Sequence, residues 1–189
     1  MISDRLVSHP IVDRKTVFSG MVWDVRHDAF ELNGETVERD YIVHPGAVAI
    51  IALNDSGELL LIEQYRHAQG KIMWEAPAGL MDLANEDPLE TAKRELFEET
   101  GYVAQTWNVL LDLANTPGGS SEQIRIYFAQ GLSLHPDGRP TGDAARGHPG
   151  QPQSILGPAG HSRVHQDPVG EDPGRRAGPS RSIDRKSVV

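Results

Sequence analysis

The amino-acid composition changes abruptly near residue 134, and this change limits how much of the chain can fold. From Leu134 onward the sequence contains no Phe, Trp or Tyr, although it holds eight of the 13 Pro and nine of the 19 Gly. A segment so poor in large apolar side chains cannot bury enough surface to offset the entropy lost on ordering. We therefore expect a folded domain over residues 1–133 and a disordered, Pro/Gly-rich tail over residues 134–189.

The overall composition excludes several classes of protein. Cys is absent, which excludes a disulfide framework and thiolate metal sites. We see no basic and apolar leader typical of secretion, so we expect a cytoplasmic protein. No stretch approaches the ~20 apolar residues of a membrane span, so we expect no membrane partner. The formal net charge of -9 disfavours non-specific binding of nucleic acid, although metal ions could still hold phosphates.

The first 133 residues combine many short strands with one clear helix, which indicates the α+β class. Runs rich in β-branched and aromatic residues, separated by turn signals such as Asn33-Gly34, predict the strands. The expected strand regions are residues 16–32, 35–45, 47–53, 58–66, 71–79, 106–117 and 123–132. We expect no strand or amphipathic helix after Leu134.

The predicted helix runs from Pro88 to Glu99. Its apolar positions recur at intervals of three and four residues and mark the buried face: Leu89, Ala92 and Leu96. Asn85 is the expected N-cap, because Pro88 then falls in the first turn. Gly101 is expected to cap the C-terminus in the left-handed conformation.

Three carboxylates, Glu95, Glu98 and Glu99, crowd the end of this helix beside its apolar face. Like charges at helical spacing repel one another, and Arg94 can pair with Glu98 four residues later. The cluster could simply be a solvated, charged helix face. Alternatively, its oxygens could bind a hard divalent cation such as Mg²⁺, which takes one or two carboxylates together with substrate phosphates.

The wider spacing favours the second interpretation. Gly79 is followed by six residues, Glu86, seven residues and the run Arg94-Glu-Leu-Phe-Glu-Glu-Thr-Gly-Tyr102. This pattern strongly resembles the Nudix box, G-x5-E-x7-R-E-U-x-E-E-x-G-U, in which U is a bulky apolar residue. It departs from that pattern by one extra residue between Gly79 and Glu86, in a loop where insertions are well tolerated.

The resemblance implies a fold and a reaction. It implies a mixed β-sheet sandwiched between helices, an α/β/α sandwich, with the box forming a loop, a helix and a loop. The implied reaction is hydrolysis of a nucleoside diphosphate linked to another moiety, with Mg²⁺ or Mn²⁺ stabilising charge. Glu95, Glu98, Glu99 and the Ala78 carbonyl resemble the metal ligands. Glu98 could instead act through metal-bound water, and Arg94 would orient a glutamate. Gly79 and Gly101 would be positions that need a small residue.

Two flanking stretches resemble the ADP-ribose pyrophosphatase branch of this family. The first combines residues 63–67 with residues 74–79, and the second contains Pro117, which lies fifteen residues after Tyr102 at the end of the box. The resemblance places Arg66 at the substrate diphosphate, a role that suits a planar guanidinium. Glu75 would lie near the substrate or behind a second metal. Residues Gly118, Gly119 and Ser120 would form a loop over the substrate. Arg66 could also be an ordinary surface residue, and Glu122 could be either a metal ligand or a surface residue.

The main expectation is therefore hydrolysis of ADP-ribose to AMP and ribose 5-phosphate, by a protein whose family usually forms homodimers. The alternatives are the same chemistry on another nucleoside diphosphate sugar, and a catalytically impaired nucleotide-binding protein. The impaired form is favoured by the lack of an acidic loop after Leu132, where this branch carries a glutamate as general base or metal ligand.

The tail itself suggests why that loop is missing. Its Arg, Pro, Gly, His and Ala content is typical of a shifted reading frame in GC-rich DNA, and Asp184–Val189 resembles a translated sequencing adapter. The alternative is a genuine, disordered, lineage-specific tail. We therefore expect the domain to lack its C-terminal part, to be poorly stable and prone to aggregate, and to show weak activity.

Overall fold

The computed structural model describes residues 3–138 and 154–158, all within the first of the two units into which the chain divides, Met1–Ala159. Its strands are β1 Ile11–Ser19, β2 Asp24–Leu32, β3 Glu35–Val43, β4 Ala47–Ala52, β5 Glu58–Arg66, β6 Lys71–Glu75, β7 Ala78–Leu80, β8 Tyr102–Val103, β9 Thr106–Ala114, β10 Gln123–Gln130, β11 Ser133–Leu134 and β12 Ser154–Pro158. The helices are the short 3-10 helix η1 His67–Gln69 and the α-helix α1 Pro88–Thr100.

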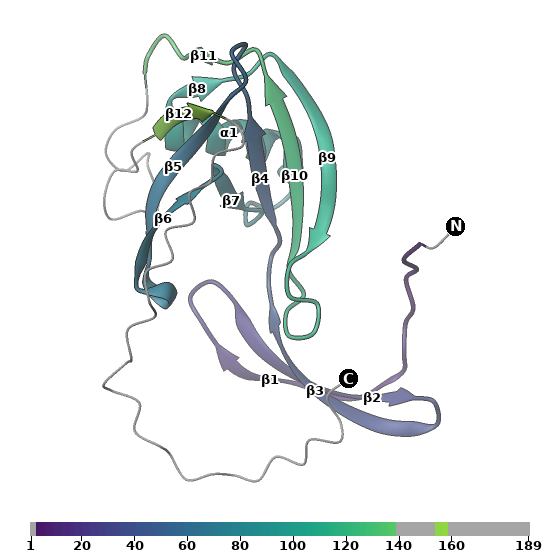
Figure 1. Cartoon of the computed structure of the whole chain (residues 1–189). Helices are drawn as coiled ribbons and strands as arrows, with labels where there is room; N and C mark the ends of the chain where they lie inside the picture. Colours follow the sequence, from purple (N-terminus) through teal and green to yellow (C-terminus); the bar gives the residue numbers. More distant parts are fainter. Residues whose placement is uncertain (1–2, 139–153, 159–189) are drawn as a thin grey trace. The chain divides into compact units, whose positions relative to one another are not determined.

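The central sheet is mixed and has the strand order β7-β4-β10-β9 (Figure 1). Strands β4 and β10 run parallel, whereas β7 and β9 pair antiparallel with their neighbours. A parallel pair requires a long crossover, and here the chain between β4 and β10 supplies β5 to β9 and α1. The mixed sheet confirms the α+β expectation.

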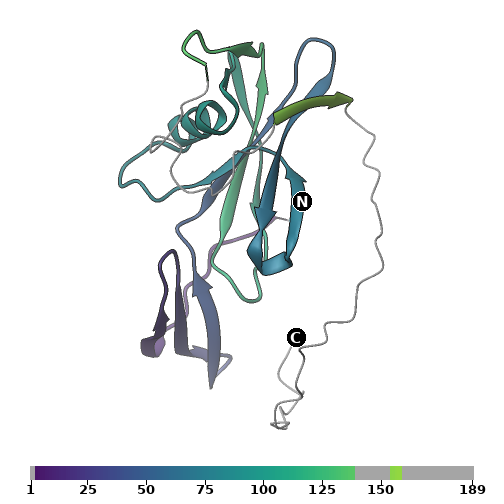
Figure 2. The ribbon, with the colours of Figure 1, turned by 90° about the vertical axis from the view of Figure 1, so that its left-hand side faces the viewer.

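The hydrophobic core lies between this sheet and α1. Figure 2 shows α1 nearly end-on, beside the sheet. In β4, buried and partly buried residues alternate strictly, as expected of a strand with one face on the core. The buried side chains of the core cluster are Val48, Ile50, Ala52, Leu60, Ala92, Leu96, Tyr127 and Ala129. This packing fixes the face that α1 turns toward the sheet, and therefore where its polar side chains lie.

Three smaller sheets accompany the central sheet: β1-β2-β3, β12-β5-β6 and the two-stranded β11-β8. Strands β1, β2 and β3 form an antiparallel sheet, in which β2 and β3 join at a tight turn with positive φ angles at Asn33 and Gly34. This confirms the predicted hairpin, because the turn that suits a two-residue loop needs positive φ at both positions. Strands β5 and β6 form the second sheet, with β12 added on the far edge of β5.

Strand β12 overturns the expectation that no strand follows Leu134. It pairs antiparallel with β5, from Ser154 opposite Ile62 to Pro158 opposite Glu58. The sequence Ser-Ile-Leu-Gly-Pro contains two adjacent aliphatic residues, and the edge of β5 offers unpaired backbone groups to such a segment. The expected tail otherwise lies mostly outside the described residues, and its predicted disorder stays a prediction.

Helix α1 begins differently from the prediction. Asn85 is not the N-cap, because Asp87 holds that position and its side chain accepts a hydrogen bond from the Leu89 backbone N–H at 2.8 Å. Asn85 instead adopts a positive φ of 65° in the preceding loop. Since Pro suits the first helical position, Pro88 makes the residue immediately before it the cap. The predicted cap at Gly101 is confirmed, with φ 75°.

Among residues 3–138 and 154–158, α1 is the one α-helix, so the helices expected on both faces of the sheet are represented there by one. No helix in this part of the chain is both long enough and apolar enough to cross a membrane. The predicted strand over residues 71–79 is two strands, β6 and β7, separated at Ala76 and Pro77.

Candidate active site

The predicted acidic residues lie on α1 where the helix meets the central sheet. Glu99 is buried, with 4% of its surface exposed, and the side chains of Glu95 and Glu98 are 15% and 27% exposed. A solvated helix face would show far higher exposure than this. The expectation that the cluster lies at the edge of the core is therefore confirmed, and Glu99 lies deeper than its neighbours.

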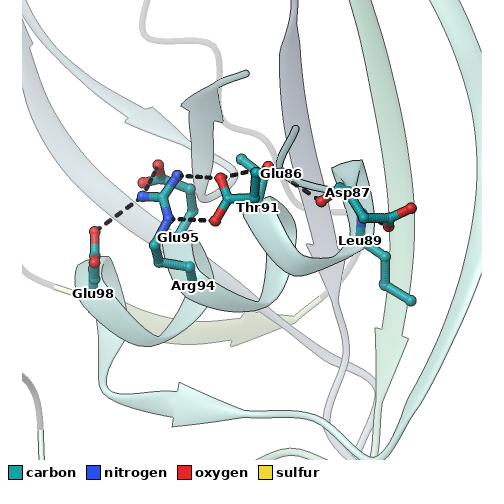
Figure 3. Close-up of polar contacts among 7 residues, drawn as sticks. All are labelled: Glu86, Asp87, Leu89, Thr91, Arg94, Glu95 and Glu98. Atoms are coloured by element: carbon teal, nitrogen blue, oxygen red, sulfur yellow. Dashed lines mark hydrogen bonds and ion pairs between the residues drawn. The ribbon is translucent and has the colours of Figure 1, made fainter. Parts of the chain in front are cut away.

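A single guanidinium, that of Arg94, connects these carboxylates (Figure 3). Its Nε and one terminal nitrogen donate to the two oxygens of Glu86, at 3.1 and 3.0 Å. Its other terminal nitrogen donates to Glu95 at 2.7 Å and to Glu98 at 3.3 Å. The planar fork thus has a fixed partner on one side and two α1 carboxylates on the other.

Glu86 reaches Arg94 from the loop before α1, eight residues earlier in the chain. The Thr91 hydroxyl donates to the same carboxylate at 2.9 Å. The pKa of Glu86 is held below its usual range, first by the hydrogen bonds from Arg94 and then by the one from Thr91. Glu86 therefore stays ionised and anchors the guanidinium.

Strand β7 brings its backbone against the cluster. The Ala78 N–H donates to Glu99 Oε2 at 3.0 Å. A Cβ atom added to Gly79 would collide with the Glu95 side chain, whose carboxyl group lies directly against this backbone. The expectation that Gly79 must be small therefore has a specific cause: the glycine leaves space for Glu95.

The cluster carries more negative than positive charge. Arg94 contacts three carboxylates, those of Glu86, Glu95 and Glu98, and Glu99 lies on the same helix as the last two. The pKa of Glu95 is raised to about 7, first by burial, which Arg94 opposes, and further by the charges of Glu99 and Glu98. A carboxylate in this situation gains from an additional cation.

The donor set suits a hard divalent cation, since it consists of carboxylate oxygens beside a backbone strand. Among the described residues, however, no three His, Cys, Asp or Glu side chains stand together in a metal-binding arrangement. In this structure Glu95 and Glu98 point toward Arg94, and Glu99 toward Ala78. A carboxylate has two acceptor oxygens and can bind a metal ion while it keeps a hydrogen bond, so a metal ion would require these side chains to draw together without leaving Arg94 or Ala78.

Arg66 lies at the end of β5 and pairs with Glu75 at the end of β6. Three hydrogen bonds of 2.5 to 3.0 Å join the two side chains. The pKa of Arg66 is raised, chiefly by these bonds and the charge of Glu75, and also by the charge of Glu99. The structure thus brings together Arg66 and Glu75, which are each predicted to lie near the substrate, and Arg66 is within electrostatic range of Glu99 on α1. The Arg66 side chain remains 44% exposed.

The predicted loop Gly118–Ser120 is fastened to the end of β3. The Ile42 N–H donates to the Gly119 carbonyl at 2.9 Å, and the Ser120 N–H donates to the Thr116 carbonyl at 2.9 Å. A Cβ at Gly118 or Gly119 would meet nothing within 4 Å. Packing therefore does not require glycine here, and the space beside the loop is open. The hydrogen bonds found for this loop do not lead to the α1 carboxylates.

Two aromatic residues near this loop have no counterpart in the sequence predictions. The rings of Trp23 and His44 stack with centroids 5.6 Å apart, and His44 Nε2 lies 3.6 Å from Glu122. Glu122 also accepts a hydrogen bond from Asn115 at 3.1 Å. These contacts favour the interpretation of Glu122 as a residue that fastens the loop. Trp23 and His44 are 21 positions apart, and no local pattern links them.

Comparison with known proteins identifies the family of the chain. A sequence model of the NUDIX domain matches residues 43–148, more than half of the chain. The chain is 45% identical over 122 residues to an ADP-ribose pyrophosphatase of Mycobacterium tuberculosis (strain ATCC 25618 / H37Rv), covering 64% of this chain and 59% of that protein. It is 41% identical over 130 residues to a methanol dehydrogenase activator of Bacillus methanolicus, covering 68% and 70%.

A solved structure described as an ADP compounds hydrolase has a similar fold. It superimposes with a TM-score of 0.66 at 27% sequence identity, covering 84% of this chain and 83% of that one. The chain belongs to the Nudix family. It matches less than two thirds of the length of the M. tuberculosis relative, and the family match extends past the boundary expected at residue 133.

Proposed function

We propose that this protein hydrolyses the diphosphate bond of a nucleoside diphosphate sugar, and that ADP-ribose is its substrate. The products would be AMP and ribose 5-phosphate: water adds to one phosphorus, the bond from that phosphorus to the bridging oxygen breaks, and the bridging oxygen leaves with the other phosphate. The observation that carries this proposal is the group of α1 carboxylates held around Arg94 in a Nudix chain.

The proposed metal ligands are Glu95, Glu98, Glu99 and the carbonyl of Ala78. Mg²⁺ or Mn²⁺ bound there would stabilise the negative charge that develops on the diphosphate. Glu98 is the proposed acceptor of a proton from the attacking water, since it is the most exposed member of the α1 cluster. Arg94 positions Glu95 and Glu98 by contacting both.

The proposed substrate contacts are made by the Arg66–Glu75 pair and by the loop Gly118–Ser120. Arg66 is partly exposed and presents a guanidinium within the electrostatic range of Glu99, which suits one phosphate of a substrate bound at α1. The open space beside Gly118 and Gly119 lets a ligand approach the backbone closely. In the present arrangement Glu75 occupies the fork of Arg66, so a phosphate would share or displace it.

A panel of substrates tests this assignment. Purified protein with Mg²⁺ would be incubated separately with ADP-ribose, GDP-mannose and UDP-glucose, and the products separated by ion-exchange chromatography. We expect AMP and ribose 5-phosphate in equal amounts, with ADP-ribose giving the highest kcat/KM. Faster cleavage of another sugar nucleotide would replace ADP-ribose as the substrate while preserving the reaction.

A second candidate is a nucleotide-binding protein with impaired catalysis. It is favoured because the sequence predicts no acidic loop after Leu132. Calorimetric titration with ADP-ribose distinguishes the two: the impaired protein would bind the nucleotide without releasing AMP.

A further inference from the structure

Thr91 is a buried polar residue that lies outside the fixed positions of the box. It sits in the second turn of α1 and has 0% of its surface exposed. Its hydroxyl lies 2.9 Å from Glu86 Oε2 and 3.3 Å from the backbone carbonyl oxygen of Asp87. A hydroxyl has a single hydrogen to donate, and a charged carboxylate at the shorter distance is the stronger acceptor.

Glu86 needs this support because of where it is. It belongs to the loop before α1, after a residue with positive φ, Asn85, so helical geometry does not fix its side chain. Its carboxylate receives two hydrogen bonds from Arg94 and one from Thr91. Of the two partners, Thr91 has the shorter side chain, which branches at Cβ and has few rotamers. It therefore fixes where Glu86 stands.

The position of Glu86 in turn fixes the direction of the Arg94 fork. With Nε and one terminal nitrogen held by Glu86, the remaining terminal nitrogen points at Glu95 and Glu98 (Figure 3). The Thr91 hydroxyl bonds to Glu86 and lies near the Asp87 carbonyl, so Glu86 and Arg94 connect it to the carboxylates of Glu95 and Glu98.

We propose that Thr91 is a positioning residue of the active site, acting through Glu86 and Arg94 on the carboxylates of Glu95 and Glu98. This inference rests on the proposed function in one respect, namely that these carboxylates hold a divalent cation. An ordinary structural role would be the back-bond to Asp87 alone, which Ser and Thr often make inside helices.

Two substitutions separate the hydroxyl from the shape of the side chain. Thr91→Val keeps the branched shape and loses the donor, whereas Thr91→Ser keeps the donor. We expect Thr91→Val to weaken Mn²⁺ binding and to lower kcat, each roughly 10-fold, the low end for partners that orient metal ligands. Thr91→Ser should restore most of both, and KM for ADP-ribose should change little. Glu90→Gln, an exposed position on the same helix, is the control.

A double-mutant cycle with Glu86→Gln tests the proposed route. If Thr91 acts through Glu86, adding Thr91→Val to Glu86→Gln should have little further effect. Multiplicative losses in the double variant would show an independent structural role and overturn the inference. So would Mn²⁺ binding and kcat that are unchanged in Thr91→Val.

Mn²⁺ binding, followed by electron paramagnetic resonance on the full chain, separates this inference from the proposed function. A chain that cleaves no sugar nucleotide but whose Mn²⁺ affinity falls in Thr91→Val and recovers in Thr91→Ser would refute the hydrolysis and retain the positioning role. Absence of Mn²⁺ binding in the unaltered chain would overturn the positioning role. Circular dichroism of each variant identifies a folding defect, and a Thr91→Val chain that fails to fold while Thr91→Ser folds and binds normally would count against the inference.

Discussion

At the scale of single residues, the main feature of the site is that one guanidinium, that of Arg94, is shared by three carboxylates. Arg94 contacts Glu86, Glu95 and Glu98, and β7 presses against Glu95 at Gly79. Arginine suits this position because its planar fork holds one partner bidentately while a further nitrogen remains to donate. A lysine, with one compact ammonium, could not keep Glu86 and the α1 carboxylates in fixed directions at once.

Gly79 and Gly118 provide a matched test of close packing. Gly79→Ala places a methyl group where the Glu95 side chain now lies, whereas Gly118→Ala enters open space. We expect Gly79→Ala to displace Glu95 and to weaken Mn²⁺ binding at least 10-fold, and Gly118→Ala to leave it unchanged. Calorimetric Mn²⁺ titration of both variants measures this. Equal affinities would show that Glu95 can move aside without consequence.

The raised pKa of Glu95 predicts a pH dependence of stability in protein free of divalent metal. The pKa of Glu95 in the folded state is about 7, against an ordinary value of 4.5, so the folded state favours the protonated form. The resulting stabilisation is complete below about pH 4.5 and is lost as the pH rises through about 7. For a shift of this size the change is about 3 kcal/mol at most. Urea unfolding at several pH values measures it.

Glu95→Gln supplies the control for this titration. The variant cannot ionise at that position, so its unfolding free energy should change less than that of the unaltered chain between about pH 4.5 and 7. The difference between the two curves reports Glu95 together with its charge interactions with Glu98 and Glu99. Parallel curves would show that the pKa of Glu95 is ordinary in the folded protein.

At the scale of elements, the site is formed by α1, by β7 and by the loop that joins them. Asp87 caps α1 through Leu89, and we expect Asp87→Ala to destabilise the protein by about 1 kcal/mol, the usual loss for an N-cap. Asn85→Gly is the comparison, because it removes the other candidate side chain while suiting the positive φ. Thermal unfolding of both variants decides between the two caps, and a larger loss from Asn85→Gly would reverse the assignment.

The sequence was sufficient to predict α1 and most strands, because apolar periodicity and turn residues act locally. It was not sufficient for the N-cap, since Asn85 and Asp87 are equally good capping types and the place of Pro88 decides between them. Strand β12 escaped detection because five residues able to pair with β5 stand within a segment whose average composition is unfavourable. The spacing of the box singled out Arg94 and the glutamates.

The sequence did not reveal which carboxylate Arg94 would hold bidentately. That partner, Glu86, depends on the path of the loop between β7 and α1, where the box has one extra residue. Thr91 escaped notice for a similar reason, because its contact with Glu86 crosses the start of the helix. Long-range stacking of Trp23 on His44 depends on tertiary structure alone.

At the scale of the whole molecule, exposed apolar side chains predict self-association. Every residue of β1 is exposed, including Val12 at 58%, Val17 at 52% and Phe18 at 62%. Several large apolar side chains exposed on one strand are typical of an interface or of aggregation. We propose a homodimer as the functional form, and expect sedimentation velocity to show association that increases with concentration.

Phe18→Ser tests the contribution of this strand. It removes a large exposed apolar group without opening a cavity, so the fold should persist while association weakens. A monomer at all concentrations in the unaltered chain would contradict the proposal. Thr36→Ser, on β3 at the other edge of the same sheet, is a control that leaves the apolar surface of β1 intact.

The most direct test of the whole account is the rate of AMP release from ADP-ribose by the purified chain, with Mg²⁺ and with excess chelator. Glu98→Gln and the exposed control Glu90→Gln would be measured beside it. We predict release that requires the metal, that falls about 10²–10⁴-fold in Glu98→Gln, and that persists in Glu90→Gln. AMP release that continues in chelator, or that is unchanged in Glu98→Gln, would contradict the assignment of the α1 carboxylates as a metal-dependent hydrolytic site.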